Sequence, residues 1–202
     1  MNRESTAYTI VFVFVVSFLF VFLLSATNEF TVDLVRSNQE TARQRAVLAA
    51  MGIPVTDPEE VAGAYRQVAD DPEAGLYASV VDGHTVYALQ FTGAGVWGQI
   101  SGVLAVSSDF RQVVGLEIVD DNETPGLGGR INEPGFKDQF RGVVVGDDRL
   151  TIGGPGSLVD GITGATGTSN AMESILNELL ELMRSEQVRA RLRQLEREGG
   201  ST

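Results

Sequence analysis

The hydrophobic pattern separates an apolar first segment from a longer domain in which polar and apolar positions alternate. Residues 8–26 carry no charged side chain and are mostly Val, Phe and Leu. As a helix this segment would span about 28 Å, close to the hydrocarbon thickness of a bilayer. We therefore predict a retained single-pass transmembrane anchor over residues 1–27. The competing interpretation, a cleaved signal peptide, is disfavoured because the apolar run is long and only Arg3 precedes it as a basic residue.

Helical composition continues after the apolar segment. Residues 28–56 begin with a stretch rich in Ala, Gln, Arg and Glu, which predicts a connecting helix that extends the membrane helix outward and stops at Gly52. Asp57 and the proline after it are a start signal for a short helix, so we begin the globular domain, residues 57–184, there. The charged tail, residues 185–202, predicts a solvated terminal helix.

Beyond residue 76 the period of the apolar positions changes to two, which is typical of strands. This pattern predicts four strands and two shorter candidates: residues 76–81, 85–91, 100–106 and 113–119, then residues 150–152 and 157–159. Residues 167–183 return to helical spacing, with an apolar stripe on one side. The order of elements predicts an α+β fold, in which a twisted antiparallel sheet is flanked by helices.

Composition narrows the chemistry that this domain can carry. The chain has 27 acidic and 15 basic residues, a net charge of −12, and so lacks the basic face that nucleic-acid binding needs. It contains no cysteine and one histidine, His84, which excludes disulfides, thiol catalysis and Cys-held metal centres. We expect no metal site and no catalytic triad, so any redox chemistry must come from an organic cofactor. Lys137 is the only lysine, which a high-salt habitat and GC-rich codon usage would explain equally.

Three segments combine glycine with side chains that could hold a ligand. The first lies directly before the closing helix, where free backbone N–H groups and the helix dipole favour a phosphate. Its candidate binding residues are Asp160, Thr163, Gly164, Ala165, Thr166, Thr168 and Ser169. The alternative is that one hydroxyl, of Thr166, Thr168 or Ser169, merely caps the helix after a Gly-rich turn.

The second segment follows the strand predicted at 113–119. Its candidate residues are Glu123, Thr124, Leu127 and Gly128, the last at a point where backbone amides could approach a ligand closely. The segment lacks the glycine spacing of a phosphate-binding or dinucleotide-binding loop. Taken alone, it is better explained as a surface loop.

The third segment places Trp97 between glycines. An indole in this position could pack against a flat ring, or it could be a core residue at the end of a hairpin. Two other groups are expected to be solvated rather than functional: His84 beside the predicted turn, and the loop pair Asp120 and Asp121.

Together these segments resemble the FMN-binding domain family. The family is shared by the C subunit of the Na+-translocating NADH:quinone oxidoreductase and the G subunit of the Rnf ferredoxin:NAD oxidoreductase complex. Its flavinylation motif is Asp, two variable residues, Ser or Thr, Gly, Ala and Thr, and it is matched at residues 160–166. Glu-Thr-Pro-Gly-Leu-Gly at 123–128 and Gly-x-Gly-x-Trp at 93–97 also match the family. Gly167 stands where the family often has a bulkier residue, and the N-terminal sequence is more similar to the C subunit.

The resemblance implies that residues 57–184 are an FMN-binding domain, and that Thr166, the last residue of the motif, carries FMN through a phosphoester bond made by a separate flavin transferase. It also implies an electron-carrier subunit of a redox complex in the bacterial inner membrane, with the FMN-binding domain on the periplasmic side. Charge alone leaves the orientation open, because arginines lie on both sides of the apolar segment. The Rnf subunit is the alternative within the same class. A non-redox, membrane-anchored binding or assembly module is the alternative from another class.

Overall fold

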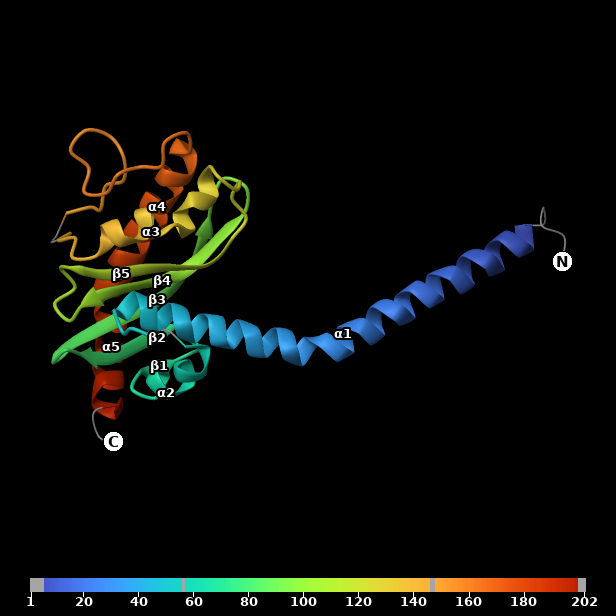
Figure 1. Cartoon of the computed structure of the whole chain (residues 1–202), viewed down its shortest axis with the longest axis horizontal. Coiled ribbons are helices and arrows are strands. Elements are labelled where there is room, and N and C mark those ends of the chain that lie inside the picture. Colours follow the sequence, from blue (N-terminus) through green and yellow to red (C-terminus); the bar gives the residue numbers. More distant parts are fainter. Residues whose placement is uncertain (1–5, 56, 146–147, 200–202) are drawn as a thin grey trace. The chain divides into compact units, whose positions relative to one another are not determined.

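The computed structural model describes residues 6–55, 57–145 and 148–199, and its strands form one five-stranded antiparallel sheet (Figure 1). The chain forms two compact units, Met1–Thr41 and Ala42–Thr202. An apolar N-terminal helix followed by this sheet and its helices confirms the predicted α+β fold. Parts of the predicted anchor, connecting helix and tail, at positions 1–5, 56 and 200–202, lie outside the described residues, and Arg3 is among them.

Helix α1, Thr6–Met51, runs without interruption from the apolar segment through the predicted connecting segment. Within the first unit its apolar side chains are exposed, and Phe18 stacks on Phe14 and on Phe22 with ring centroids 6.5 Å apart. By length and composition, this is the one helix in the described part of the chain that could cross a membrane. The finding agrees with the predicted anchor.

The predicted stop of α1 at Gly52 is confirmed. Gly52 adopts a φ of 81°, a conformation that favours glycine. Its N–H donates to the carbonyl of Ala49 (3.2 Å), and the N–H of Ile53 donates to the carbonyl of Leu48 (2.9 Å). These two bonds form a Schellman motif, which satisfies the last carbonyl groups of the helix.

The strands follow the chain order across the sheet, β1-β2-β3-β4-β5. Their bounds are Ala69–Asp71, Leu76–Val81, His84–Ala94, Gln99–Ser107 and Val113–Asp121. The turn between β2 and β3 is the predicted one, since Asp82 and Gly83 have φ values of 50° and 78°, as a type I′ hairpin turn requires. Strand β1 was not predicted, because its three residues are half-buried and have no apolar alternation.

Each face of the sheet has its own core. One face packs against the buried end of α1, with the short helices η1 (Pro58–Glu60) and α2 (Val61–Tyr65) nearby in sequence. Helices α4 (Thr166–Arg184) and α5 (Glu186–Gly199) cover the other face. The predicted apolar stripe of α4 is confirmed, because all its members are buried: Met172, Ile175, Leu176, Leu179 and Met183.

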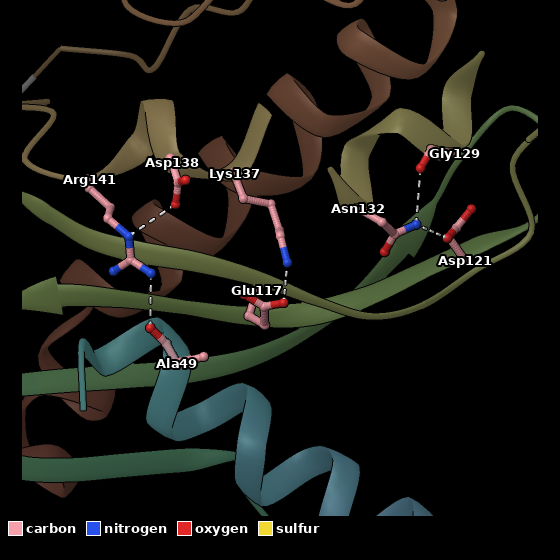
Figure 2. Close-up of polar contacts among 8 residues, drawn as sticks. All are labelled: Ala49, Glu117, Asp121, Gly129, Asn132, Lys137, Asp138 and Arg141. Carbon is pink, nitrogen blue, oxygen red and sulfur yellow. Dashed lines mark hydrogen bonds and ion pairs between the residues drawn. The ribbon is translucent and has the colours of Figure 1, made fainter. Parts of the chain in front are cut away.

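Three short helical segments join β5 to the loop before α4: η2 (Gly128–Asn132), α3 (Pro134–Lys137) and η3 (Asp138–Phe140). Polar side chains fasten this run to its neighbours (Figure 2). Lys137 forms an ion pair with Glu117 on β5. Arg141 bonds to Asp138 (3.3 Å) and donates to the carbonyl of Ala49 near the end of α1 (3.3 Å). The run is therefore held against both the sheet and the end of α1.

The prediction of a solvated C-terminal helix was wrong. Leu192 and Leu195 of α5 are 0% and 2% exposed, and they belong to the core. Arg191 forms an ion pair with Asp71 on β1 (2.8 Å). The apolar positions are spaced as on one helix face, but charged residues outnumber them and conceal the pattern in the sequence.

The two short strands predicted at 150–152 and 157–159 were also wrong. Only an isolated parallel bridge joins Ile152 and Val159. Side chains of α4 take the place of strand partners: Asn177 accepts from the N–H of Leu150 (2.9 Å), and Glu173 accepts from the N–H of Ile152 (2.7 Å). Helix side chains thus fix the loop that leads to the N-terminus of α4.

Docking of α5 should depend on pH through Glu196. Hydrogen bonds from the hydroxyls of Thr85 (2.7 Å) and Tyr87 (2.7 Å) hold the pKa of the Glu196 carboxyl below its ordinary value of 4.5. A group with a lowered pKa stabilises the fold above its unfolded-state pKa, and this contribution disappears as the pH falls through the folded-state pKa. The free energy of unfolding of Glu196→Gln, measured by denaturant titration, should be below that of the wild type at pH 7.

The gap between the free energies of unfolding of the two proteins should narrow as the pH falls through the lowered pKa of Glu196, where the wild-type carboxyl becomes protonated as well. Glu181→Gln, which alters an exposed carboxylate on α4, is the matched control and should leave the pH profile unchanged. An equal gap at pH 7 and at a pH low enough to protonate the wild-type Glu196 carboxyl would contradict the assignment.

Candidate functional site

Three loops meet at one end of the sheet and line a pocket of about 160 Å³. They are the turn between β3 and β4, the loop after β5, and the start of α4. The lining residues are Val96, Trp97, Glu123, Thr124, Leu127, Gly128, Gly164, Ala165, Thr166, Gly167 and Thr168. All three glycine-containing segments singled out in the sequence therefore contribute to one pocket.

The buried carboxylate of Glu123 joins these three loops. Its Oε1 accepts from the backbone N–H groups of Val96 (2.7 Å) and Trp97 (3.1 Å), and its Oε2 accepts from the Thr168 hydroxyl (2.6 Å). Both Glu123 and Thr168 are buried. Among the described residues, these three donors satisfy the carboxylate without a cationic partner, and hydrogen bonds to an ionised acceptor are the stronger kind.

The glycine at position 128 is required by the same carboxylate. A Cβ atom on Gly128 would lie 2.5 Å from Glu123 Oε2 and 2.5 Å from Thr168 Oγ1. Gly95 lies against the other carboxylate oxygen, because a Cβ atom added to Gly95 would lie 2.4 Å from Glu123 Oε1. The two glycines therefore let the neighbouring loops close around Glu123.

Within the described residues, no side chain caps the N-terminus of α4. Ala165 occupies the N-cap position, and the hydroxyl of Thr168 is used by Glu123. Ser169 supports the preceding loop instead: its Oγ accepts from the N–H of Ile162 (3.0 Å) and donates to the carbonyl of Ala165 (3.2 Å). The first N–H groups of a helix have no intrahelical acceptor, so this end of α4 can bind an anion. The capping alternative for these hydroxyls is therefore wrong.

The hydroxyl of Thr166 is available at this helix end. Thr166 is exposed, and the preceding turn at Gly164 has a φ of 82°. A Cβ on Gly164 would lie 3.5 Å from the side chain of Leu127. Small neighbours on both sides, Ala165 and Gly167, leave the Thr166 side chain accessible to another molecule.

Apolar side chains stand exposed around the pocket. Trp97 is 72% exposed, Val96 50% and Leu127 46%. The alternative that Trp97 belongs to the core is therefore wrong. Exposed apolar groups that converge on a polar, glycine-lined pocket are typical of a binding surface rather than of a plain loop.

Two residues of the first segment lie elsewhere. Asp160 and Thr163 line a neighbouring pocket of about 150 Å³, and the N–H of Asp160 donates to Gln139 Oε1 (2.8 Å). A third and larger cavity, about 520 Å³, includes Thr163, Gly164, Thr166 and Ser169 in its lining. Thr166 thus borders two cavities, and Asp160 is absent from the lining of the pocket that holds Trp97.

Sequence reasoning missed Asp121. The expectation of a solvated loop was wrong, because Asp121 ends β5 and its side chain accepts from the N–H of Glu123 (2.8 Å) and from Asn132 Nδ2 (2.5 Å; Figure 2). An aspartate two residues before a turn residue can form this kind of side chain–backbone bond, and that spacing was the available signal. His84 is exposed, as expected.

The chain is similar to known proteins. The family model described as "FMN-binding domain" matches residues 95–181. The G subunit of an ion-translocating oxidoreductase complex from Methanosarcina acetivorans is 31% identical over 160 residues, which cover 77% of this chain and 81% of the relative. The chain belongs to the FMN-binding domain family. The resemblance inferred from the motifs is confirmed.

Other members of the family differ in length. The C subunit of the Na+-translocating NADH-quinone reductase from Yersinia pestis is 33% identical over 139 residues, and the chain spans about half of its length, 51%. Solved structures of this family share the fold. The C subunit from Parabacteroides distasonis superposes with a TM-score of 0.61 over 71% of this chain and 90% of that chain, at 24% identity. NqrC from Shewanella oneidensis gives 0.64 over 79% and 99%, at 21% identity.

The pocket fits the cofactor that gives the family its name. The free N–H groups at the start of α4 suit a phosphate, and the Thr166 hydroxyl lies beside them. The exposed side chains of Trp97 and Leu127 offer apolar surfaces to a flat ring. In the described part of the chain, no group of His, Cys, Asp or Glu residues is arranged to hold a metal ion.

Gly128→Ala should destabilise the protein by about 1–3 kcal/mol, because the added methyl group overlaps Glu123 and Thr168. Denaturant unfolding of the full chain in detergent would measure this loss. Gly135→Ala is the matched control, since a Cβ there meets nothing within 4 Å, and its effect should stay within about 0.5 kcal/mol. Equal stability of the two variants would contradict the tight contact at Gly128.

Proposed function

We propose that the chain is a membrane-anchored electron-carrier subunit of an ion-translocating oxidoreductase complex, and that it bears FMN covalently, through a phosphoester bond, on Thr166. The observation that carries the proposal is the exposed Thr166 hydroxyl beside the uncapped N-terminus of α4. The sequence has no cysteine that could hold an iron–sulfur cluster. Bound FMN supplies electron transfer in steps of one or two electrons.

Each residue of the pocket has a role in this proposal. Thr166 provides the oxygen that links to the phosphoryl group, and the α4 dipole favours the remaining negative charge. Leu127 and Trp97 contact the flavin ring with their exposed apolar surfaces. Glu123 holds the loops of the pocket together and does not react, because its oxygens are used by Val96, Trp97 and Thr168.

Attachment of the cofactor requires a second protein. A threonine hydroxyl is a weak nucleophile without an adjacent base. The lining of the pocket includes no histidine or lysine, and its one carboxylate is occupied by Thr168 rather than Thr166. A separate, magnesium-dependent flavin transferase would supply the base and transfer the FMN part of FAD to the Thr166 oxygen, so that the new phosphoester bond forms as the pyrophosphate bond of FAD breaks and AMP leaves. Asp160 and Thr163, the other motif residues, lie in the neighbouring pocket, where the transferase could contact them.

Helix α1 and the family support a location in a membrane. The apolar part of α1 would anchor the chain in the bacterial inner membrane, with the FMN-binding domain on the periplasmic side. The partners would be other subunits of a membrane redox complex, which exchange electrons with the flavin, and not nucleic acid, given the net charge of −12. The Na+-translocating NADH:quinone oxidoreductase is the complex we favour on the N-terminal sequence.

The Rnf complex is the second candidate. The G subunit from Methanosarcina acetivorans aligns with more of this chain, 77%, than the C subunit from Yersinia pestis, 63%, and the chain covers more of that relative. The genes that neighbour the coding sequence would separate the two, because the complexes differ in their NADH-facing or ferredoxin-facing subunits.

Thr166→Ala should abolish covalent flavin. The full chain would be produced together with a working flavin transferase, denatured, separated by electrophoresis and viewed under ultraviolet light. We expect a fluorescent wild-type band and a dark Thr166→Ala band, while Thr92→Ala, an exposed threonine outside the pocket, stays fluorescent. A dark wild-type band, with the transferase active on another substrate, would overturn the proposal and favour a non-redox, membrane-anchored module.

Trp97→Ala should change the surroundings of the flavin without removing it. The Trp97 side chain is mostly exposed, whereas its backbone N–H provides the bond to Glu123, so truncation leaves the loop in place. In-gel fluorescence should be retained, and the visible absorption of the flavin in the folded protein should shift. Loss of covalent flavin from this variant would argue against the role assigned to Trp97.

A further inference from the structure

One carboxylate fastens both ends of the loop that carries Glu123 and Leu127. Asp121 Oδ1 accepts from the N–H of Glu123 at the start of the loop (2.8 Å), and Oδ2 accepts from Asn132 Nδ2 beyond its end (2.5 Å). Asn132 Nδ2 also donates to the carbonyl of Gly129 (3.1 Å). Figure 2 shows these two bonds of Asn132, between η2 and the end of β5.

The loop between these two anchor points is a tight turn in its own right. The carbonyl of Thr124 accepts from the N–H groups of Leu127 (3.1 Å) and Gly129 (3.0 Å). A turn with internal bonds moves as a unit, so its position depends on how its ends are attached. Leu127, 46% exposed, has little core packing of its own to fix it.

Other polar contacts hold α3 and η3, which follow the turn in the chain. Lys137 pairs with Glu117, and Arg141 bonds to Asp138 and to Ala49. These bonds hold α3 and η3 to β5 and to the end of α1. The turn itself is attached by the bonds of Asp121 and Asn132, in addition to the Glu123 carboxylate and the buried side chain of Ile131. Neither residue lines the pocket that contains Trp97 and Thr166.

We propose that Asp121 and Asn132 are positioning residues, which set the place of Leu127 and Glu123 in the cofactor pocket without touching the cofactor. The proposal rests on the proposed function for the identity of the cofactor. The arrangement of the two side chains is independent of it. Loss of the hydrogen bonds between Asp121, Asn132 and Glu123 should loosen the turn and alter the surroundings of the flavin. Thr166 and the covalent bond from Thr166 to the flavin should stay intact.

The donor and acceptor pattern allows a sharp test. In Asp121→Asn the oxygen of the new amide can accept one of the two bonds. Its NH2 group then faces the other donor, either the Glu123 N–H or Asn132 Nδ2, and two donors cannot bond to each other. In Asn132→Asp two carboxylates face each other. The double variant Asp121→Asn with Asn132→Asp restores a donor opposite an acceptor between the two side chains, but it loses the bond to the carbonyl of Gly129, because a carboxylate at position 132 has no hydrogen to donate. Asp120→Asn removes the same charge from the preceding, exposed residue and is the matched control.

The experiment uses the full chain in detergent, produced with the flavin transferase, and reads three signals. Limited trypsin digestion after Arg130 reports opening of the turn, with cleavage after Arg149 in the same molecule as reference. Visible absorption reports the surroundings of the flavin, and fluorescence after denaturation reports covalent attachment. We expect Asp121→Asn to raise relative cleavage after Arg130 roughly tenfold, as expected for one lost bond to a charged group, and to shift the absorption.

We expect the double variant to recover part of both signals, because the bond to the Gly129 carbonyl is not restored, and Asp120→Asn to behave as the wild type. Attachment should be unchanged throughout. Unchanged cleavage and absorption in Asp121→Asn, or no recovery in the double variant, would overturn the proposal that Asp121 and Asn132 hold the turn. If the wild-type band is dark, the proposed function fails, but cleavage after Arg130 still decides whether the two residues hold the turn. A cleavage increase without any absorption shift in a flavin-bearing protein would overturn the positioning role.

Discussion

The Glu123 carboxylate is the group on which the pocket depends. A carboxylate that is buried without a cation must be satisfied by hydrogen-bond donors, and here the donors come from two segments far from it in sequence. This requirement draws the β3–β4 turn and the start of α4 onto the loop after β5. It also uses the hydroxyl of Thr168, so that the hydroxyl of Thr166, half a turn earlier, is left for another molecule.

The sheet brings these three segments to the same end. The β3–β4 hairpin turns there, β5 ends there with Asp121, and α4 begins there before its apolar stripe packs across the sheet. The core therefore fixes the ends of the three loops, and short-range bonds from Glu123 and Asp121 fix the loops themselves. Apolar side chains such as Trp97 and Leu127 can then stay in solvent, because the backbone that carries them does not rely on their burial.

Much of this arrangement could be predicted from the sequence, and the failures have physical causes. Period-two alternation located the central strands, and the stripe on α4 located its buried face, because burial on one side imposes those periods. The motif residues from Trp97 to Thr166 were identified from the sequence. The sequence did not predict that Asp160 and Thr163 border a neighbouring pocket, because the distance between loops is a tertiary property. Asp121 and the core role of α5 were missed for a similar reason: polar residues were assigned to solvent, and their partners lie on other elements.

The size of the pocket bears on why a covalent link would be needed. Sites that hold a cofactor by non-covalent contacts usually enclose about 300–1,000 Å³ and cover most of the ligand, whereas the pocket that Trp97 and Leu127 line measures about 160 Å³. The cavity of about 520 Å³ that Thr166 also borders includes neither of these two side chains in its lining. Exposed side chains at the rim of the smaller pocket would cover only part of a flavin ring. A phosphoester bond at Thr166 would keep the flavin at a high effective concentration without deep burial. A shallow site would then leave the ring edge open to a partner, which an electron carrier with no substrate of its own requires.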